Sequence, residues 1–205
     1  MKNLYDKDYY ERGIETGRSC YTNYRWIPEL TIPMAARIIE YCGIGEDDKI
    51  LDYGCAKGYC VKAFRLLHRQ AYGFDISEYA RDNAPKDVEE YILPELEGSY
   101  SWIISKDVFE HVPYEEIDEL LCRLRKMTKN MFAVIPLGGG IEGRYIVPAY
   151  ELDSTHIIRE DLQWWTERFQ QAGFEVMEAA YSVKHIKENW ENFEKGNGFF
   201  LLKSK

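Results

Sequence analysis

A glycine-rich turn placed between two carboxylates is the first pattern in the sequence that could do chemistry. The stretch ILDYGCAKGYC, residues 50–60, is an apolar run that ends at Asp52 and then turns through Gly54 and Gly58. Gly54 allows a sharp turn, and Gly58 allows the backbone to approach a ligand closely. Asp75 ends the next apolar run, where a carboxylate can accept hydrogen bonds from both hydroxyls of a ribose. The pattern predicts a binding site for a cofactor that contains a nucleoside.

Two classes of cofactor use this strand–turn–helix geometry, and the glycine spacing separates them. Dinucleotide sites use G-x-G-x-x-G, because a pyrophosphate rests on the helix N-terminus. Here Ala56 stands between Gly54 and Gly58, and the bulky Tyr59 stands where the longer motif needs its last glycine. Asp52 suits an amino-acid ammonium but does nothing for a pyrophosphate. The spacing therefore favours a cofactor with an amino-acid tail and no phosphates.

Four segments in order along the chain resemble the class I S-adenosylmethionine (SAM)-dependent methyltransferases. They are LDYGCAKG, YGFDIS, SWIISKDVFEHVP and DSTHIIREDLQWWTERFQQAGF. The resemblance spans roughly residues 45–205. The departure from the family pattern is Ala56, where the middle glycine is usual; it adds only a methyl group, so we expect the turn to tolerate it. The resemblance implies SAM as cofactor and S-adenosylhomocysteine (SAH) as product.

The resemblance also implies roles for individual residues. Asp52 would lie near the methionyl ammonium, and Asp75 would hold the ribose. Each has a simpler alternative, because Asp52 could cap the turn and Asp75 could cap the helix that follows. The other residues expected to contact the cofactor are Gly54, Cys55, Ala56 and Gly58 around the methionyl part, Ile76 on the adenine, and Asp107 beside the sulfonium.

Histidines are the candidates for general-base chemistry on an oxygen acceptor. His156, in the loop after the fifth strand, is the first choice as base or substrate contact, because this family often receives its acceptor there. His111 is the second choice, although it could instead hold its loop by hydrogen bonds. Asp107, Glu110 and His111 also have the spacing of a D-x-x-E-H metal cluster. A further ligand, such as His156, would have to come from elsewhere, so we predict no metal.

The elements that must position these residues alternate between strands and helices. Such a pattern predicts an α/β three-layer sandwich, in which a seven-stranded, mostly parallel sheet with one antiparallel strand has helices on both faces. We expect helices from Pro33 to Cys42, after Gly58, near Ser77, from Pro113 and from Arg159. The expected strands are Lys49–Tyr53, Ala71–Phe74, Val88–Leu93, Tyr100–Ser105, residues 131–137, Phe174–Val183 and Gly198–Lys203.

Length and composition limit the class of protein. With 205 residues the chain can form one such domain, predicted here at residues 33–205 after an aromatic N-terminal cap or lid at residues 1–32. No apolar run approaches the ~20 residues that span a bilayer, so no membrane contact is expected. Five cysteines without a CxxC motif fit a reducing cytoplasm. A net charge of −9 argues against nucleic acid as partner.

These observations favour an enzyme that methylates a small molecule, with a hydroxyl of a sugar or other metabolite as the preferred acceptor. The aromatic N-terminus would suit a sugar or a flat ring. Two alternatives remain: a nicotinamide-dependent oxidoreductase, against which the glycine spacing counts, and a SAM-binding module without turnover. The sequence does not indicate the oligomeric state.

Overall fold

A seven-stranded sheet forms the centre of the protein. In the computed structural model, which describes residues 4–139, 143–188 and 192–205, the strand order is β3-β2-β1-β4-β5-β7-β6. The β1, β2, β3, β4 and β5 strands are mutually parallel, and β7 is antiparallel to both of its neighbours. This confirms the predicted fold class. The strands are β1 (Lys49–Tyr53), β2 (Gln70–Phe74), β3 (Ile92–Leu93), β4 (Tyr100–Lys106), β5 (Thr128–Pro136), β6 (Phe174–Ala180) and β7 (Asn197–Ser204).

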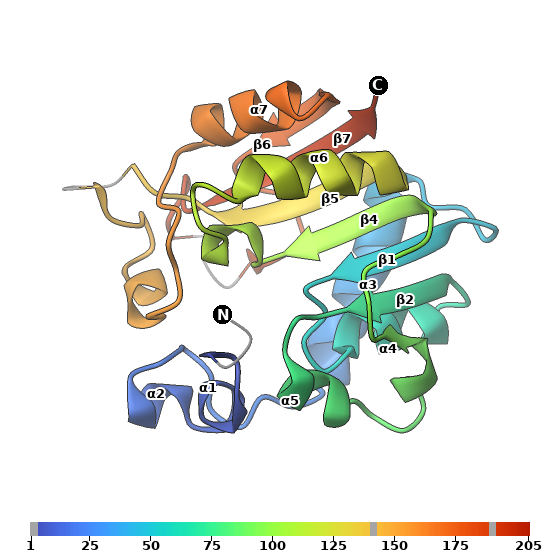
Figure 1. Ribbon diagram of the computed structural model, residues 1–205, viewed down its shortest axis with the longest axis horizontal. Helices are drawn as coiled ribbons and strands as arrows, with labels where there is room; N and C mark the ends of the chain where they lie inside the picture. The colour runs from blue at the N-terminus through green and yellow to red at the C-terminus, as the bar shows by residue number, and fades with distance from the viewer. Residues whose placement is uncertain (1–3, 140–142, 189–191) are drawn as a thin grey trace.

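Alternation along the strands supplies a separate core on each face of the sheet. In β1, Ile50 packs with helices α3 (Pro28–Cys42) and α4 (Tyr59–Leu66), whereas Leu51 packs with α6 (Ile117–Met127) and α7 (Leu162–Gln171). Successive side chains of a strand point to opposite faces, so an apolar strand contributes side chains to the hydrophobic core on both faces of the sheet. Figure 1 shows the resulting sandwich, with the two helix pairs on opposite sides of the sheet.

The strand order reverses between β1 and β4. From β1 the chain continues outward through β2 to β3, and from β4 it continues in the other direction to β5. Ligands bind at the carboxyl ends of strands at such a point. Three connections meet at this edge of the sheet. They are the turn from β1 to α4, the loop from β2 to α5 (Glu78–Asp82), and the loop from β4 through the 3-10 helix η3 (Phe109–His111).

The N-terminal cap, here residues 4–26, lies across from that edge (Figure 1). It contains α1 (Lys7–Glu11) and α2 (Gly13–Thr16). Ser77 Oγ donates to the carbonyl of Tyr5 at 2.6 Å, and the Tyr9 hydroxyl donates to Asp153 at 2.8 Å. Burial of one large aromatic side chain stabilises by about 1.5–3 kcal/mol, and the cap buries three: Tyr5, Tyr9 and Tyr10. The cap is therefore held by its own small core and by hydrogen bonds.

Several element boundaries differ from the sequence prediction. Helix α3 begins at Pro28, not after Pro33, because Pro28 already provides a favourable first helical position and Pro33 is tolerated inside the helix. The predicted strand Val88–Leu93 was mostly wrong, because the chain forms the 3-10 helix η2 (Glu89–Tyr91) before the two residues of β3. Helix α6 begins at Ile117, α7 begins at Leu162 with Asp161 as its cap, and β6 ends at Ala180.

The sequence also predicts that the loop after the three glycines at residues 138–140 completes the wall on the acceptor side. The third glycine and residues 141–142 lie outside the described ranges. Further along the chain, Pro148–Leu152 form another 3-10 helix, η5. Within the described part of the chain, every helix is too short or too polar to cross a bilayer.

Candidate functional site

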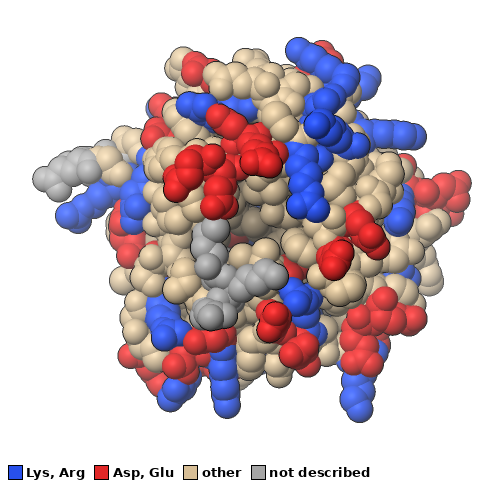
Figure 2. Space-filling model, in the orientation of Figure 1, with Lys and Arg blue, Asp and Glu red and all other residues tan. Residues whose placement is uncertain are grey.

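A cavity of about 600 Å³ opens at the reversal point of the sheet, between the strand ends and the N-terminal cap. Figure 2 shows a hollow near the middle of this face, with charged side chains of both signs around it. The wall comes from residues far apart in sequence. It is lined by Asp52, Tyr53, Gly54, Cys55, Ala56, Cys60, Phe74, Asp75, Ile76, Lys106, Asp107, Val108, His111, Val112, Glu116, Glu119, Leu120 and Arg123, and by five cap tyrosines.

The glycine-rich turn forms one wall through unusual backbone angles. Gly54 has a φ of +78°, and a Cβ atom added there would lie 2.4 Å from Val108 Cγ2. Ala56 also has a positive φ, of +50°, so it adopts the left-handed conformation although it is not a glycine. Its amide donates to Asp75 Oδ2 at 2.7 Å. The methyl group is thus accommodated, and the carboxylate fixes the turn.

Asp75 lies at the end of β2, where its carboxylate joins two loops. Besides the Ala56 amide, Oδ1 accepts the amide of Ser77 at 2.8 Å. The side chain is almost fully buried, and this burial raises its pKa above the usual value, against the two amide hydrogen bonds. Each oxygen keeps a further lone pair, since a carboxylate offers about four acceptor positions. These lone pairs are available to hydroxyl donors in the cavity.

Asp52 is a buried carboxyl on the cavity wall. Among the described residues no hydrogen bond reaches its side chain, which is 5% exposed. Burial raises the pKa of Asp52 to about 7, and the Lys106 ammonium opposes that rise. A cationic group in the cavity would favour the ionised form. The chemistry of this carboxyl therefore suits an ammonium ligand.

Asp107 lies between two lysines. Its carboxylate contacts the ammonium groups of both Lys106 and Lys187, and these charges hold the pKa of Asp107 below its usual value although burial opposes them. The backbone of Asp107 has a φ of +59°, which changes the direction of the chain after β4. Sequence reasoning missed Lys187, because it belongs to the connection after β6 and only the fold brings it here. Lys106 could have been identified from the sequence, since it directly precedes Asp107.

Tyrosines of the cap form the opposite side of the cavity. Tyr5, Tyr9, Tyr10, Tyr21 and Tyr24 all line it. Their rings contact one another, for example Tyr21 and Tyr24 at 4.8 Å between centroids. The many aromatic residues near the N-terminus led to the prediction of a cap or lid, and in the structure these rings line the cavity.

The two predicted histidines are neighbours, but only one lies on the cavity wall. His111 lines the cavity, whereas His156 is buried behind it and is not among the lining residues. Their ring centroids lie 4.6 Å apart. Burial lowers the pKa of His111 to about 4, helped by His156, and burial likewise lowers the pKa of His156. Both imidazoles are neutral at pH 7, and Glu110 lies beside them.

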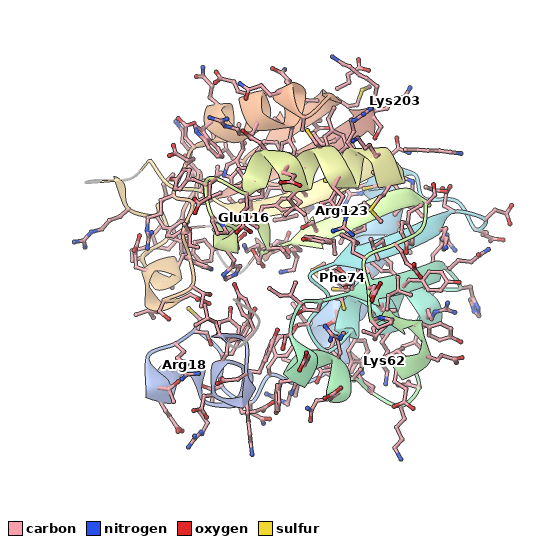
Figure 3. All side chains as sticks on the ribbon, in the orientation of Figure 1. Arg18, Lys62, Phe74, Glu116, Arg123 and Lys203 are labelled. Carbon is pink, nitrogen blue, oxygen red and sulfur yellow. The ribbon has the colours of Figure 1, made fainter. Side chains whose placement is uncertain are left out.

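The fold thus brings most of the predicted site residues to one cavity. Gly58 is an exception, because it is the cap residue of α4 and packs against Ile92 away from the cavity. Several residues that line the cavity had no feature in the sequence that marked them as part of the site. In Figure 3, Glu116 and Arg123 lie on the α6 side of the opening and Phe74 lies at the end of β2. The positions of Glu116 and Arg123 depend on how α6 packs on the sheet.

The sequence matches the family described as methyltransferase domain over residues 29–179. The chain belongs to this methyltransferase family. Family members use SAM, and Asp52, the glycine-rich turn and Asp75 all line the same cavity. No curated protein matches the sequence.

Solved structures share the methyltransferase fold at low sequence identity. The partner of the Haloferax volcanii Trm112 methyltransferase activator is 16% identical, with a TM-score of 0.64 over 86% of this chain and 91% of that one. A TehB-like SAM-dependent methyltransferase from Corynebacterium glutamicum is 17% identical, with a TM-score of 0.61 over 84% and 88%. Magnesium protoporphyrin IX methyltransferase from Synechocystis with bound SAH is 14% identical, with a TM-score of 0.64 over 99% and 92%.

Proposed function

We propose that this methyltransferase transfers the SAM methyl group to a hydroxyl of a small-molecule acceptor, such as a sugar or another metabolite. One observation carries the proposal: a single cavity is bounded by Asp52 and Asp75 at the sheet edge, by His111, and by five tyrosines of the cap. This open cavity therefore offers both a cofactor side and an aromatic acceptor side.

The cofactor side has a group for each part of the ligand. Asp75 would accept hydrogen bonds from the ribose hydroxyls, and Asp52 would pair with the methionyl ammonium. Ile76 and Val108, which both line the cavity, would flank the adenine, and Asp107 would lie towards the sulfonium. Bound SAM supplies a methyl carbon activated by the sulfonium charge, and sulfur keeps the electrons of the broken bond.

The acceptor side offers one neutral imidazole. His111 donates its Nδ1 hydrogen to Thr155 Oγ1, at 2.8 Å, because that hydroxyl already donates to Asp153 Oδ1 at 2.6 Å. Nε2 of His111 is consequently left with a free lone pair, and this atom would accept the proton of the acceptor hydroxyl. His156 packs against His111 and would act through it as a positioning residue.

The size and chemistry of the cavity favour a small acceptor over nucleic acid. Five tyrosine rings suit a sugar face or a flat ring, and each adds a hydroxyl that can donate a hydrogen bond. The net charge of −9 supports the same choice. The five cysteines, which all lie in the described ranges, are free. That observation supports a reducing, cytoplasmic location.

The test combines binding with turnover. Calorimetry with SAH and NAD should give binding of SAH alone, and NAD binding in its place would favour an oxidoreductase. Radiolabelled SAM incubated with pools of hydroxylated metabolites should label one class of acceptor. His111→Gln should bind SAH as the parent does but lose roughly 100-fold or more in turnover, the scale of general-base catalysis. SAH binding without methylation of any pool would indicate a binding module.

A further inference from the structure

We propose that Glu110, His111 and His156 bind a divalent transition-metal ion at the acceptor end of the cavity. Their ligand atoms all lie within 4.8 Å of one another. The proposal contradicts the sequence expectation of no metal, and it rests on which hydrogen-bonding groups face each other there.

In both histidines Nε2 presents a lone pair, not a hydrogen, to the other two side chains of the cluster. The hydrogen bond of His111 to Thr155 fixes the hydrogen on Nδ1, as derived above. Nδ1 of His156 lies 2.8 Å from the backbone carbonyl of Tyr150, and a carbonyl can only accept, so His156 also carries its hydrogen on Nδ1. Nε2 of each neutral ring is therefore an acceptor.

Glu110 adds a third acceptor that nothing in the described residues satisfies. Its side chain is 0% exposed, and neither carboxylate oxygen has a hydrogen-bond partner. Oε1 lies 4.0 Å from Nε2 of His111 and 3.9 Å from Nε2 of His156, too far for a hydrogen bond. A buried carboxyl without a partner is costly, and buried charges are paired or coordinate metals. A cation between the three groups would satisfy all three acceptors at once, and it would oppose the burial that raises the pKa of the Glu110 carboxyl.

The outer contacts resemble those of a metal site. Metal-binding histidines usually donate their other ring hydrogen to a carboxylate, carbonyl or hydroxyl that fixes the ring. His111 does so through Thr155 to Asp153, and His156 does so to the Tyr150 carbonyl. An ion bound at about 2.1 Å holds its ligands about 3.4 Å apart in a tetrahedral site. The Glu110 oxygen therefore needs to approach each histidine nitrogen by only about half an ångström.

The three ligand side chains favour a transition-metal ion and leave one of its coordination positions open. Two imidazoles and one carboxylate suit Zn²⁺ and similar transition metals, whereas Mg²⁺ and Ca²⁺ prefer oxygen ligands. Asp107, the first residue of the D-x-x-E-H spacing, is engaged by Lys106 and Lys187 and is not a ligand. Because His111 lines the cavity, a remaining position on the ion would face the acceptor.

The inference deepens the proposed function and rests on it for the identity of the acceptor alone. The role of His111 as base applies to the protein without the ion. With the ion bound, Nε2 of His111 would be a ligand, and the cation would instead lower the pKa of the acceptor hydroxyl, whose proton would pass to water. Binding of the ion itself requires neither SAM nor an acceptor, so it can be measured alone.

The test uses the 205-residue chain after it has been stripped with a chelator and dialysed. Calorimetry with ZnCl₂ should give one ion per chain, and Co²⁺ should produce visible absorption bands that Zn²⁺ abolishes. His156→Gln and Glu110→Gln should weaken Zn²⁺ binding by about 100-fold or more, and Thr155→Val by about 10–100-fold, as outer contacts do. His68→Asn, at an exposed histidine with a φ of +57°, is the matched control and should bind Zn²⁺ as the parent does.

Two outcomes would overturn the site. One is the absence of stoichiometric Zn²⁺ or Co²⁺ binding by the stripped parent, which would leave a buried water as the occupant. The other is Zn²⁺ binding that His156→Gln and Glu110→Gln leave unchanged while both variants still bind SAH. Binding of SAH by the stripped protein is measured in parallel, so failure of the metal site and failure of the methyltransferase proposal give different results.

Discussion

The ammonium of Lys57 lies 2.5 Å from the carboxylate of Glu11 and joins the glycine-rich turn to the N-terminal cap. Lys57 also donates to the carbonyl of Tyr24, and Glu11 accepts the hydroxyl of Tyr79. The Lys57 side chain is 8% exposed, so this pair is largely shielded from water. The glycine-rich turn and the N-terminal cap, which lie on opposite sides of the cavity, are therefore linked by this ion pair.

Removing that link should loosen the cap. In Lys57→Gln, the Glu11 carboxylate loses its cation, which costs about 1–3 kcal/mol for a hydrogen-bonded, partly buried charge. Limited proteolysis should cut the cap at least about tenfold faster, and SAH should dissociate faster. Lys203→Gln, at an exposed lysine of β7, removes the same charge far from the cap and should change neither rate. Equal cleavage in both variants would show that the ion pair does not hold the cap.

The carboxylate of Asp75 should decide ribose binding. Asp75→Ala removes the acceptor for the ribose hydroxyls, and each hydrogen bond to a charged group is worth about 1.5–3 kcal/mol. Calorimetry should show SAH affinity reduced by roughly 10–1000-fold. Asp75→Asn keeps one acceptor oxygen and should lose less. Because Asp75 also holds the amides of Ala56 and Ser77, thermal unfolding of each variant separates misfolding from lost contacts. A folded Asp75→Ala that binds SAH normally would refute the ribose role.

Affinity for SAH should depend on pH through Asp52. The pKa of this carboxyl is raised to about 7 in the free protein, because burial favours the neutral form. Between its unfolded pKa near 3.9 and this value the folded chain binds more protons than the unfolded chain, so this group lowers stability as pH rises. The ligand ammonium favours the ionised carboxylate, so affinity should fall by up to tenfold for each pH unit below about 7.

The variant Asp52→Asn tests this dependence. It cannot titrate, so its SAH affinity should be lower at pH 8 and flat across the same range of pH. Calorimetry from pH 5.5 to 8.5 would measure both proteins. A parent whose affinity does not change over that range would exclude the proposed contact between Asp52 and the ammonium.

A methyl group at Gly54 should damage the site by collision as well as by strain. The added Cβ would lie 2.4 Å from Val108 Cγ2, and the φ of +78° disfavours any L side chain. Gly54→Ala should therefore lower stability by about 2–4 kcal/mol and weaken SAH binding. Gly43 is the matched control, since its φ is +69° but nothing lies within 4 Å of the added Cβ. Gly43→Ala should cost only about 1 kcal/mol.

The collision itself can be tested with a second substitution. Adding Val108→Ala to Gly54→Ala removes the atoms that collide and should recover part of the lost stability in chemical denaturation. If the double variant is no more stable than Gly54→Ala, the damage comes from the backbone angle alone.

The sequence by itself determined the alternation of strands and helices, the glycine-rich turn and the two carboxylates at the strand ends. These are local features, because apolar periodicity and turn residues act over a few positions. The cofactor class followed from the same turn. The start of α3 was missed because two prolines, Pro28 and Pro33, each gave a helix signal, and β3 was overestimated because edge strands carry little pattern.

Only the tertiary structure decided which side chains share the cavity. It placed His111 on the wall and His156 behind it, brought Lys187 to Asp107 from a distant loop, and set Glu110 against two histidine lone pairs. Such contacts depend on chain segments separated by many residues, whose approach is fixed by strand order and packing and not by local pattern. The glycine-rich turn and Asp75 lie in consecutive loops, so the sequence could place them at one edge of the sheet, whereas the contacts among His111, His156 and Lys187 join distant segments and could not be read from it.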